Sequence, residues 1–355
     1  MQRQASCLKV PKRQGETTLT TVKLLGLIEK DLEIGKDNDF LYIPVIRRPS
    51  ATELKTLKKT GVDFEVSTGL FSERNKKTRI NAVLQSELSL HSLASLPRAA
   101  DFVGEIAIIE IPPELKPYEK SIGNAILRVN KNVRTVLAKA GAVSGTYRLR
   151  EFKVIAGEAS TETIHKEAGC RFKVDVTKAY FSPRLSHEHQ RITSLVREGE
   201  TVVDLFSGVG PFAIMIARAH ANVKVYAVDV NPHAVEYLKT NIRLNRVIGR
   251  VYPFLADARK ITDEKLSGIA DRVIMNLPES AIEFVDAACQ ALKTEGGFIH
   301  FYSFINASSS VENVKLIFKK AVEKSGRRVE EFVCSKTVRE TAPHEWQSVL
   351  DVRIS

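Results

Sequence analysis

The sequence lacks the features that mark membrane, secreted and disulfide-stabilised proteins. No apolar run approaches the roughly 18 residues that a membrane-spanning helix needs, and the first sixteen residues contain no apolar stretch of the kind found in secretion signals. There are four cysteines, far apart and without a C-x-x-C pair: Cys7, Cys170, Cys289 and Cys334. We therefore expect no disulfide framework, no zinc ribbon or other metal, no membrane contact and a cytoplasmic location.

Acidic residues are in deficit, and unevenly so. The chain has 53 Lys and Arg against 42 Asp and Glu, a net charge of +11, and residues 1–200 account for +9 of it. Residues 121–150 carry six basic residues and no acidic one. This excess favours a polyanionic partner such as nucleic acid. We expect three residues of this stretch to contact phosphates: Arg128, Lys131 and Arg134. The alternative for each is a solvated helix face.

Length and pattern divide the 355 residues into three predicted blocks. Residues 1–68 mix short strands and helices, and residues 67–80 are polar and basic, which indicates a linker or an exposed loop. Residues 69–190 form a second block, with a strand at 105–111 and a helix at about 119–140. From residue 191 the third block begins, and its pattern becomes regular.

In residues 191–355, apolar strands alternate with amphipathic helices. This alternation predicts an α/β fold with a doubly wound parallel sheet. The last two predicted strands, at 327–334 and 347–354, have no helix between them. A parallel sheet that ends in an antiparallel C-terminal strand is typical of Rossmann-like class I methyltransferases, whereas plain dinucleotide-binding domains usually continue the alternation.

The strongest motif is VVDLFSGVGPF at 202–212. A strand ends at Asp204, and a turn with Gly208 and Gly210 opens a helix, so a ligand could approach the backbone closely. A nicotinamide fingerprint requires a third glycine, which is missing here. An acid before the turn suits a cationic sulfonium or ammonium group better than a pyrophosphate, which points to S-adenosylmethionine. The alternative is an ordinary glycine turn of an α/β domain.

Polar side chains also follow the next three strands. Asp229 is placed to bind the ribose hydroxyls, and Asp257 could accept a hydrogen bond from the adenine amino group. Asn276, in the sequence Asn-Leu-Pro after the fourth strand, could read the edge of a nucleobase. The alternative for each acid is a helix cap, and for the asparagine a plain proline turn.

A second cluster lies just upstream, in YFSPRLSHEH at 180–189. Glu188 is the only acid between residues 178 and 196. His187 and His189 flank it, but without a third nearby ligand we do not expect a metal site. His189 could approach the cofactor carboxylate, and Tyr180 could stack on a base or pack in the core.

Taken together, these segments resemble a known family. YRLREFKVIAGE, TIHKEAGCRFKVDVTKAYFSPRLSHE, VVDLFSGVGPF, YAVDVNPHAVEYLKTNI and VIMNLPESA are similar to the archaeal and eukaryotic tRNA guanosine-37 N1-methyltransferases, and the similarity extends to the N-terminal CLKVPKRQGE. The resemblance implies a class I methyltransferase domain preceded by two smaller α+β RNA-binding domains. It also implies that the first domain docks the outer corner of tRNA, while the other two hold the anticodon loop.

The resemblance assigns roles to individual residues. Guanine N1 carries a proton at neutral pH, so a base must remove it while charge grows on O6. Glu188 is implied as the base, Arg148 as the O6 stabiliser and Asn276 as the residue that holds the base beside the cofactor. The expected cofactor-binding set is His189, Asp204, Phe206, Gly208, Gly210, Asp229, Val230, Asp257, Ala258 and Asn276. The expected substrate-binding set, apart from the three phosphate contacts, is Arg148, Tyr180, Arg184, Asn276 and Pro278.

The sequence is also compatible with three other functions. On the same fold, a related enzyme of wyosine synthesis transfers an aminocarboxypropyl group to a tricyclic base at the same tRNA position, and some members methylate that base at carbon 7. A non-catalytic RNA-binding module is disfavoured by the complete set of strand-end residues. A nicotinamide oxidoreductase is disfavoured by the missing third glycine. One active site in one long chain suggests a monomer.

Overall fold

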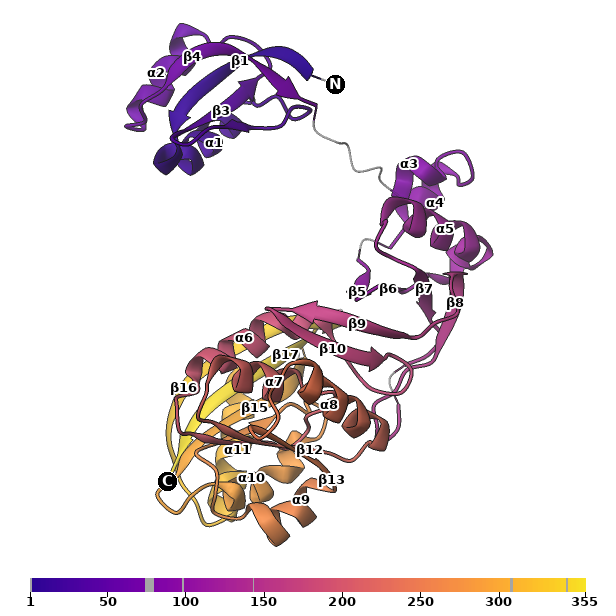
Figure 1. Cartoon of the computed structure of the whole chain (residues 1–355), viewed down its shortest axis with the longest axis vertical. Coiled ribbons are helices and arrows are strands. Elements are labelled where there is room, and N and C mark those ends of the chain that lie inside the picture. Colours follow the sequence, from indigo (N-terminus) through magenta and orange to yellow (C-terminus); the bar gives the residue numbers. More distant parts are fainter. Residues whose placement is uncertain (1, 74–79, 98, 143, 307–308, 343) are drawn as a thin grey trace. The chain divides into compact units, whose positions relative to one another are not determined.

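The computed structural model describes residues 2–73, 80–97, 99–142, 144–306, 309–342 and 344–355 (Figure 1). The chain forms two compact units, Met1–Arg79 and Ile80–Ser355. The predicted boundary at residue 68 falls inside a strand, β4 (Glu65–Ser72), which pairs along its length with β1 (Gln2–Pro11). The first unit therefore extends further than the loop-like composition of 67–80 indicated. Residues 74–79 of that expected linker lie outside the described part.

In its described residues, the first unit is a four-stranded sheet with two α-helices and one short 3-10 helix. The strand order is β2-β3-β1-β4, and β1 runs antiparallel to both of its neighbours. The remaining described elements are β2 (Gly35–Lys36), β3 (Phe40–Val45), η1 (Lys12–Gln14), α1 (Gly15–Leu24) and α2 (Ala51–Lys59). Buried aliphatic side chains from both helices and from β1 and β3 form its core, so the unit has a hydrophobic core of its own.

The second unit begins with a small α+β section. Its sheet has the order β5-β6-β7-β8, and α5 packs against β7 and β8. The elements are α3 (Ile80–Leu84), α4 (Leu90–Ala94), β5 (Asp101–Val103), β6 (Ile106–Ile109), η2 (Pro113–Tyr118), α5 (Glu119–Val129), β7 (Thr135–Lys139) and β8 (Phe152–Gly157). The helix predicted at 119–140 is thus wrong in its second half. Val133 and Val136 continue the apolar spacing of α5, but Val136 is buried within β7.

A hairpin joins this section to the larger sheet. It consists of β9 (Glu162–Glu167) and β10 (Cys170–Asp175), followed by η3 (Pro183–Leu185) and α6 (Ser186–Leu195). The Asn241 side chain, from α8 (Pro232–Leu244), accepts a hydrogen bond from the backbone of Lys173 at 2.7 Å and so attaches β10 to helix α8. The boundary predicted at residue 190 falls inside α6. This helix contacts both η3, which precedes it, and α7 (Pro211–Ala219).

The C-terminal part is a seven-stranded sheet in the order β13-β12-β11-β14-β15-β17-β16. The first five strands are parallel, and β17 runs antiparallel to β15 and β16. The strands are β11 (Thr201–Asp204), β12 (Lys224–Asp229), β13 (Val251–Leu255), β14 (Arg272–Met275), β15 (Gly297–Asn306), β16 (Val329–Ala342) and β17 (Glu345–Ile354). The class I methyltransferase-like sheet predicted from the sequence is confirmed.

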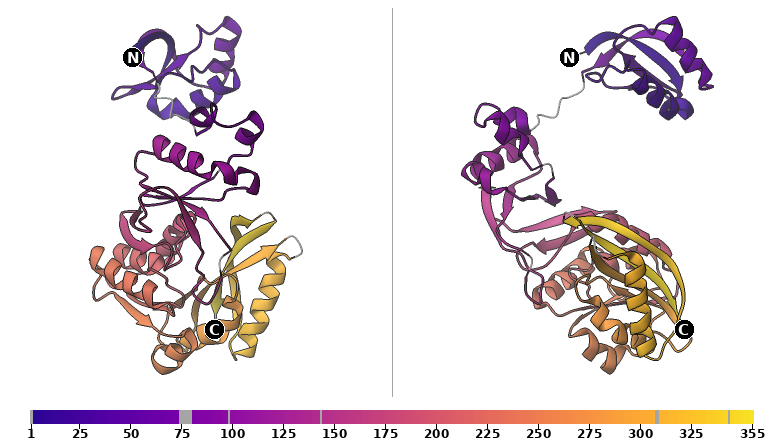
Figure 2. Two further views of the ribbon diagram at one scale, coloured as in Figure 1. Left: turned by 90° about the vertical axis from the view of Figure 1, so that its right-hand side faces the viewer. Right: turned by 180° about the vertical axis from the view of Figure 1, so that it is seen from behind.

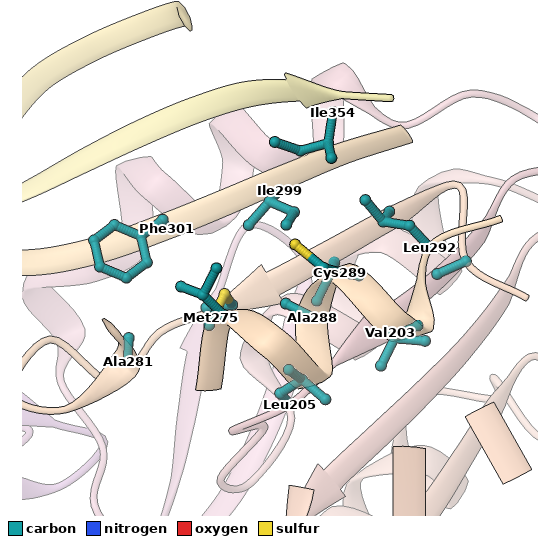
Figure 3. Close-up of a cluster of buried hydrophobic side chains, with 14 of the residues drawn as sticks. Val203, Leu205, Met275, Ala281, Ala288, Cys289, Leu292, Ile299, Phe301 and Ile354 are labelled. Carbon is teal, nitrogen blue, oxygen red and sulfur yellow. The ribbon is translucent and has the colours of Figure 1, made fainter. Parts of the chain in front are cut away.

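Helices cover both faces of this sheet (Figure 2). Besides α6 and α8, they are α7 (Pro211–Ala219), α9 (Ala258–Ile261), η4 (Thr262–Leu266), η5 (Ala281–Phe284), α10 (Val285–Ala291) and α11 (Val311–Lys324). On one face, Ala288 and Cys289 of α10 pack with Ile299 of β15 and Met275 of β14 (Figure 3). In the described ranges, no helix is long and apolar enough to cross a membrane. Because β11, β12, β13 and β14 are parallel, the loops after them meet at one edge of the sheet.

Candidate active site

A cavity of about 350 Å³ lies at the carboxyl ends of the parallel strands. Its walls come from the loops after β11, β12, β13 and β14, from the segments around residues 145–148 and 180–189, and from the C-terminal strands. Eleven of the residues expected at the site line it: Arg148, Tyr180, His189, Phe206, Gly208, Asp229, Val230, Asp257, Ala258, Asn276 and Pro278. Segments that are far apart in the sequence therefore converge on one pocket.

The two glycines of the turn after β11 have different reasons to be glycine. Both have positive φ angles, 55° at Gly208 and 91° at Gly210. Gly208 lines the cavity, and a Cβ there would have only the Tyr180 carbonyl oxygen within 4 Å, at 3.7 Å. A Cβ on Gly210 would lie 2.4 Å from a methyl group of Leu238. Gly208 thus keeps the cavity wall open, whereas Gly210 is not among the lining residues and allows α7 to pack against α8.

Two strand-end acids hold the backbone of the cavity wall. Asp229 accepts hydrogen bonds from the N–H groups of Gly208 at 2.7 Å and Asn231 at 2.8 Å, and burial raises the pKa of its carboxyl. Asp257 caps α9 by accepting from the N–H groups of Arg259 and Lys260. The capping alternative therefore holds for Asp257, yet both acids line the cavity, where their remaining lone pairs can accept hydrogen bonds from hydroxyl or amino groups.

Asp204 has a different environment. Its side chain is fully buried, its Oδ2 has no hydrogen-bond partner, and it is not among the residues that line the cavity. Burial raises its pKa, the backbone N–H of Phe206 opposes this, and the nearby charge of Asp229 adds to it, so that the pKa is about 7. The carboxyl that the sequence placed against a cationic ligand lies behind the cavity wall.

His189 lines the cavity and has one ring nitrogen without a partner. Its Nδ1 lies 2.7 Å from Oε1 of Glu167, at the end of β9, while its buried Nε2 has no partner. His165 lies on the other side of the same carboxylate, with its Nε2 3.9 Å from Oε2 of Glu167. His165 of β9 and His189 of α6 thus both contact the Glu167 carboxylate, and this carboxylate sets the orientation of the His189 ring. Within the described residues, no group of three potential ligands could hold a metal ion.

Glu188 is buried in a network of charges and does not line the cavity. Oε1 lies 2.8 Å from Nζ of Lys336, Oε2 accepts from Arg191 at 2.9 Å, and the Tyr302 hydroxyl donates to Oε2 at 3.1 Å. Burial by itself would raise the pKa of Glu188, but hydrogen bonds and charge from Arg191 and Lys336 outweigh it, and the pKa is lowered. Glu188 is therefore a carboxylate held on a helix next to the cavity, with its lone pairs occupied.

Arg148 sits on a strained turn. The backbone bonds between Ser144 and Leu149 close the turn, and Arg148 adopts φ 55°, a left-handed conformation that is unusual for a non-glycine residue. Its guanidinium lies 5.5 Å from the centre of the Tyr180 ring, and Nη1 lies 3.1 Å from Oε2 of Glu279 without hydrogen-bond alignment. Nη1 is thus a buried donor without a hydrogen bond, in a residue that lines the cavity.

Two cavity residues come from the C-terminal strands and escaped the sequence analysis: Arg339 of β16 and Gln347 of β17. Gln347 donates to Oδ1 of Asn276 at 3.2 Å and accepts from Nε of Arg339 at 2.9 Å. The two residues are register partners in the β16–β17 ladder. Only knowledge of that register, together with the sheet order, could have placed them beside Asn276.

Four of the expected substrate contacts lie outside the cavity lining. Arg184 pairs with Asp101 and so fastens η3 to β5. Arg128 is exposed near the end of α5. Lys131 and Arg134 line a second, open cleft between β5, β9 and β10. The three phosphate-contact candidates are therefore on the surface, as a contact with a polyanion requires.

The cavity suits a nucleoside that carries a charged tail. Asp229 and Asp257 offer acceptors to hydroxyl and amino groups, and the glycine turn leaves room for close approach at Gly208. Nε2 of His189 is a buried polar atom without a partner, which a ligand carboxylate can satisfy. The residues present thus fit S-adenosylmethionine, the cofactor that the strand-end pattern indicated.

Comparison with known families agrees with this geometry. Residues 163–335 match the model of the TRM5/TYW2 methyltransferase domain. Residues 7–53 match the tRNA methyltransferase 5 N-terminal domain, and residues 80–161 match the TYW2 N-terminal domain. The three matches together span most of both compact units.

Individual relatives are similar over long stretches. The tRNA (guanine(37)-N(1))-methyltransferase Trm5b of Pyrococcus abyssi is 39% identical over 348 residues, which is 98% of each chain. The tRNA 4-demethylwyosine(37)-methyltransferase Taw21 of Saccharolobus solfataricus is 35% identical over 71% of this chain and 92% of its own. Among solved structures, the complex of aTrm5 and tRNALeu is 32% identical, with a TM-score of 0.68 and coverage of 98% of this chain and 99% of that one.

Proposed function

The chain belongs to the TRM5/TYW2 family of S-adenosylmethionine-dependent tRNA methyltransferases, and we propose that it methylates N1 of guanosine 37 in tRNA. The observation that carries the proposal is the convergence of Arg148, Tyr180 and Asn276 with the strand-end residues on one cavity. The guanidinium, the aromatic ring and the amide of these residues would bind the target nucleobase, next to the acceptors that would bind the nucleoside cofactor.

The cofactor would lie against the carboxyl ends of β11, β12 and β13. Asp229 would accept from the ribose hydroxyls, Asp257 from the adenine amino group, and His189 would donate to the carboxylate of the amino-acid tail. The side chains of Phe206, Val230 and Ala258 would supply apolar contacts. When bound, S-adenosylmethionine supplies a methyl group on a positively charged sulfur, open to attack by a lone pair.

The protein's own part is proton transfer and charge stabilisation. The lone pair of N1 becomes available only when the N1 proton leaves, and Glu188 is the proposed acceptor of that proton. In its present geometry, Oε1 of Glu188 is paired with Lys336, whose side chain is 42% exposed. Release of that ion pair opens a lone pair on Oε1, because water can solvate the lysine. Nε of Arg191 still donates to Oε1 at 3.1 Å, and Arg191 and Tyr302 continue to hold Oε2.

Arg148 is the proposed partner of guanine O6. As the proton leaves N1, negative charge grows on O6, and a fixed guanidinium donor lowers the energy of that state. Nη1 supports this role, because it is paired with Glu279 at 3.1 Å without a hydrogen bond and can donate to O6 once it turns from that carboxylate. Tyr180 would hold the base by stacking, beneath the same guanidinium. Pro278 would restrict the backbone of the loop that carries Asn276.

The tRNA body would be held by surface charge. Arg128, Lys131 and Arg134 are proposed to contact phosphates of the anticodon stem, and the first unit, Met1–Arg79, to dock the outer corner. Such contacts add affinity and make it salt-dependent, without reading sequence. Because guanosine 37 is in a loop, its extrusion costs less than that of a paired base.

A second candidate function has a specific observation in its favour. The middle section matches the TYW2 N-terminal domain, and the similar Taw21 protein is a demethylwyosine methyltransferase by name. The same cavity could present a tricyclic base for methylation at carbon 7 or for aminocarboxypropyl transfer. The match of residues 7–53 to the tRNA methyltransferase 5 N-terminal domain favours guanosine.

The test uses purified protein, S-adenosylmethionine with a radiolabelled methyl group, and two unmodified tRNA transcripts with guanosine or adenosine at position 37. Nucleoside digestion and mass analysis then locate the label. We expect 1-methylguanosine from the guanosine transcript only. Cofactor binding without label transfer to either transcript would contradict the proposal and favour the tricyclic base, which a third, demethylwyosine-containing tRNA then tests directly.

A further inference from the structure

Three side chains form a one-way chain of hydrogen bonds toward the cavity. Nε of Arg339 donates to Oε1 of Gln347 at 2.9 Å, and Nε2 of Gln347 donates to Oδ1 of Asn276 at 3.2 Å. All three residues line the cavity, and Gln347 is 1% exposed. Solvent therefore cannot readily replace the partners of the glutamine amide.

Arg339 sets the direction of this chain. A guanidinium has only donors, so Gln347 must turn its oxygen toward Arg339 and its NH₂ group toward Asn276. Asn276 must then accept the hydrogen bond from the Gln347 NH₂ group with its side-chain oxygen. Reversal of either amide would place two donors or two acceptors face to face, so the assignment of oxygen and nitrogen follows from chemistry and not from the rotamer alone. The NH₂ group of Asn276 is then the group left to the occupant of the cavity.

The same arginine also holds the opposite wall. Its Nη1 donates to the Ser182 hydroxyl at 2.9 Å, and its Nη2 donates to the Tyr180 hydroxyl at 3.3 Å. One guanidinium therefore connects the segment that carries the aromatic ring with the strand that orients the amide. Arg339 spans both sides of the place proposed for the target base.

We infer that Arg339 and Gln347 are positioning residues that make Asn276 an obligate hydrogen-bond donor, and thereby a reader of the acceptor edge of guanine. This inference rests on the proposed function, since it assigns the base that the amide faces. Guanine presents two acceptors, O6 and N7, on that edge, whereas adenine replaces O6 by an amino donor. A fixed amide donor can donate to O6 of guanine but meets a second donor at the amino group of adenine. Both bases share N7, so the discrimination arises at O6.

The decisive variant is Gln347→Glu, which keeps the side-chain length and reverses the polarity. A carboxylate only accepts, so it can keep its bond to Arg339 but obliges Asn276 to turn its NH₂ group away from the cavity. We expect the single-turnover rate of methyl transfer to the guanosine-37 transcript, at saturating tRNA and cofactor, to fall about 10- to 100-fold, as for a buried polar group left without its partner. The dissociation constant of S-adenosylmethionine should stay unchanged.

Reversed polarity has a second consequence, which mere loss of structure would not produce. We compare the inhibition constants of the adenosine-37 transcript and of the methylated guanosine-37 product. Their ratio should shift in favour of the adenosine-37 transcript in Gln347→Glu compared with the wild type. If the variant instead loses cofactor affinity and keeps its rate, the amide of Asn276 faces the cofactor and the inference is wrong. Full activity of Gln347→Glu would overturn it as well.

Arg339 provides an independent test in case Gln347→Glu does not fold. Arg339→Lys keeps a donor-only side chain and should retain more activity than Arg339→Gln, whose amide can face Gln347 in either direction. Arg353→Ala is the matched control, because Arg353 lies on the exposed side of β17 and pairs with Glu330. Equal rates for the lysine and glutamine variants would refute the inference. A wild type inactive on both transcripts would instead refute the proposed function.

Discussion

Nδ1 of His189 lies 2.7 Å from Oε1 of Glu167, and the second ring nitrogen, Nε2, is buried without a partner in a residue that lines the cavity. The sequence suggested a histidine near the cofactor but contained no sign of the carboxylate that orients it. If Nε2 holds the carboxylate of the cofactor tail, the affinity for cofactor depends on an acid 22 residues away along the chain.

Glu167→Gln tests this dependence. An amide can still accept from Nδ1 but carries no negative charge, so it holds the ring less strongly. The cofactor should therefore bind about tenfold more weakly, as expected for the loss of a charge-assisted hydrogen bond. Calorimetry with S-adenosylmethionine measures this, and tRNA affinity should not change. Glu162→Gln is the control on the same strand, since Glu162 is exposed and pairs with Lys173. Equal cofactor affinity of both variants would remove Glu167 from this role.

Lys336→Met tests whether Lys336 sets the pKa of the proposed base, Glu188. The pKa of Glu188 is lowered in part by Lys336, so removal of the lysine should raise it. A carboxyl that is protonated cannot take the N1 proton, and the rate falls as the pH drops through its pKa. The acidic limb of the kcat/KM profile should therefore move to higher pH in Lys336→Met and stay near the wild-type position in Lys336→Arg. An unmoved limb in both would show that another group titrates.

Arg148→Gly separates catalysis from stability. Glycine adopts the φ of 55° at this position without strain, so the free energy of unfolding should change by less than about 1 kcal/mol. Methyl transfer should slow about 100-fold or more, as for the loss of a donor to a developing oxyanion. Arg246→Gly is a matched control, because Arg246 has a φ of 57° and lies on the surface. A variant that binds tRNA more weakly but reacts at the normal rate would make Arg148 a phosphate contact.

Asp204→Asn should stabilise the protein at high pH. The pKa of Asp204 is raised to about 7 in the folded state, so its contribution to stability is present at pH 4 and is lost as the pH rises through 7. The asparagine variant escapes this loss. A pKa raised from 3.8 to about 7 corresponds to up to about 4 kcal/mol at pH 8.

Urea unfolding at pH 5 and pH 8 measures the difference. The single tryptophan, Trp346, lies in β17 and reports on this unit. Asp263→Asn is a control at an exposed carboxyl of the same unit. A stability gain for Asp204→Asn that is the same at both pH values would mean that the carboxyl does not titrate in this range.

Local sequence was sufficient for much of this molecule. The alternation after residue 191 predicted the parallel sheet, because strand and helix periods are properties of short segments. The acids at strand ends and the glycine turn were likewise recognisable, since parallel strands bring their carboxyl ends to one edge whatever the packing elsewhere. Asp229, Asp257, Gly208 and Asn276 all reached the cavity for this reason.

Other features depended on contacts between distant segments. The apolar spacing of α5 continued into β7, and local pattern could not show that the later residues pair with β6 and β8. Glu188 meets Lys336, and Asn276 meets Gln347, only because β17 inserts between β15 and β16 in a particular register. Side-chain periodicity is a local property of the chain, whereas the choice of partner for each buried polar group follows from sheet order and register, which arise only when the whole unit has folded.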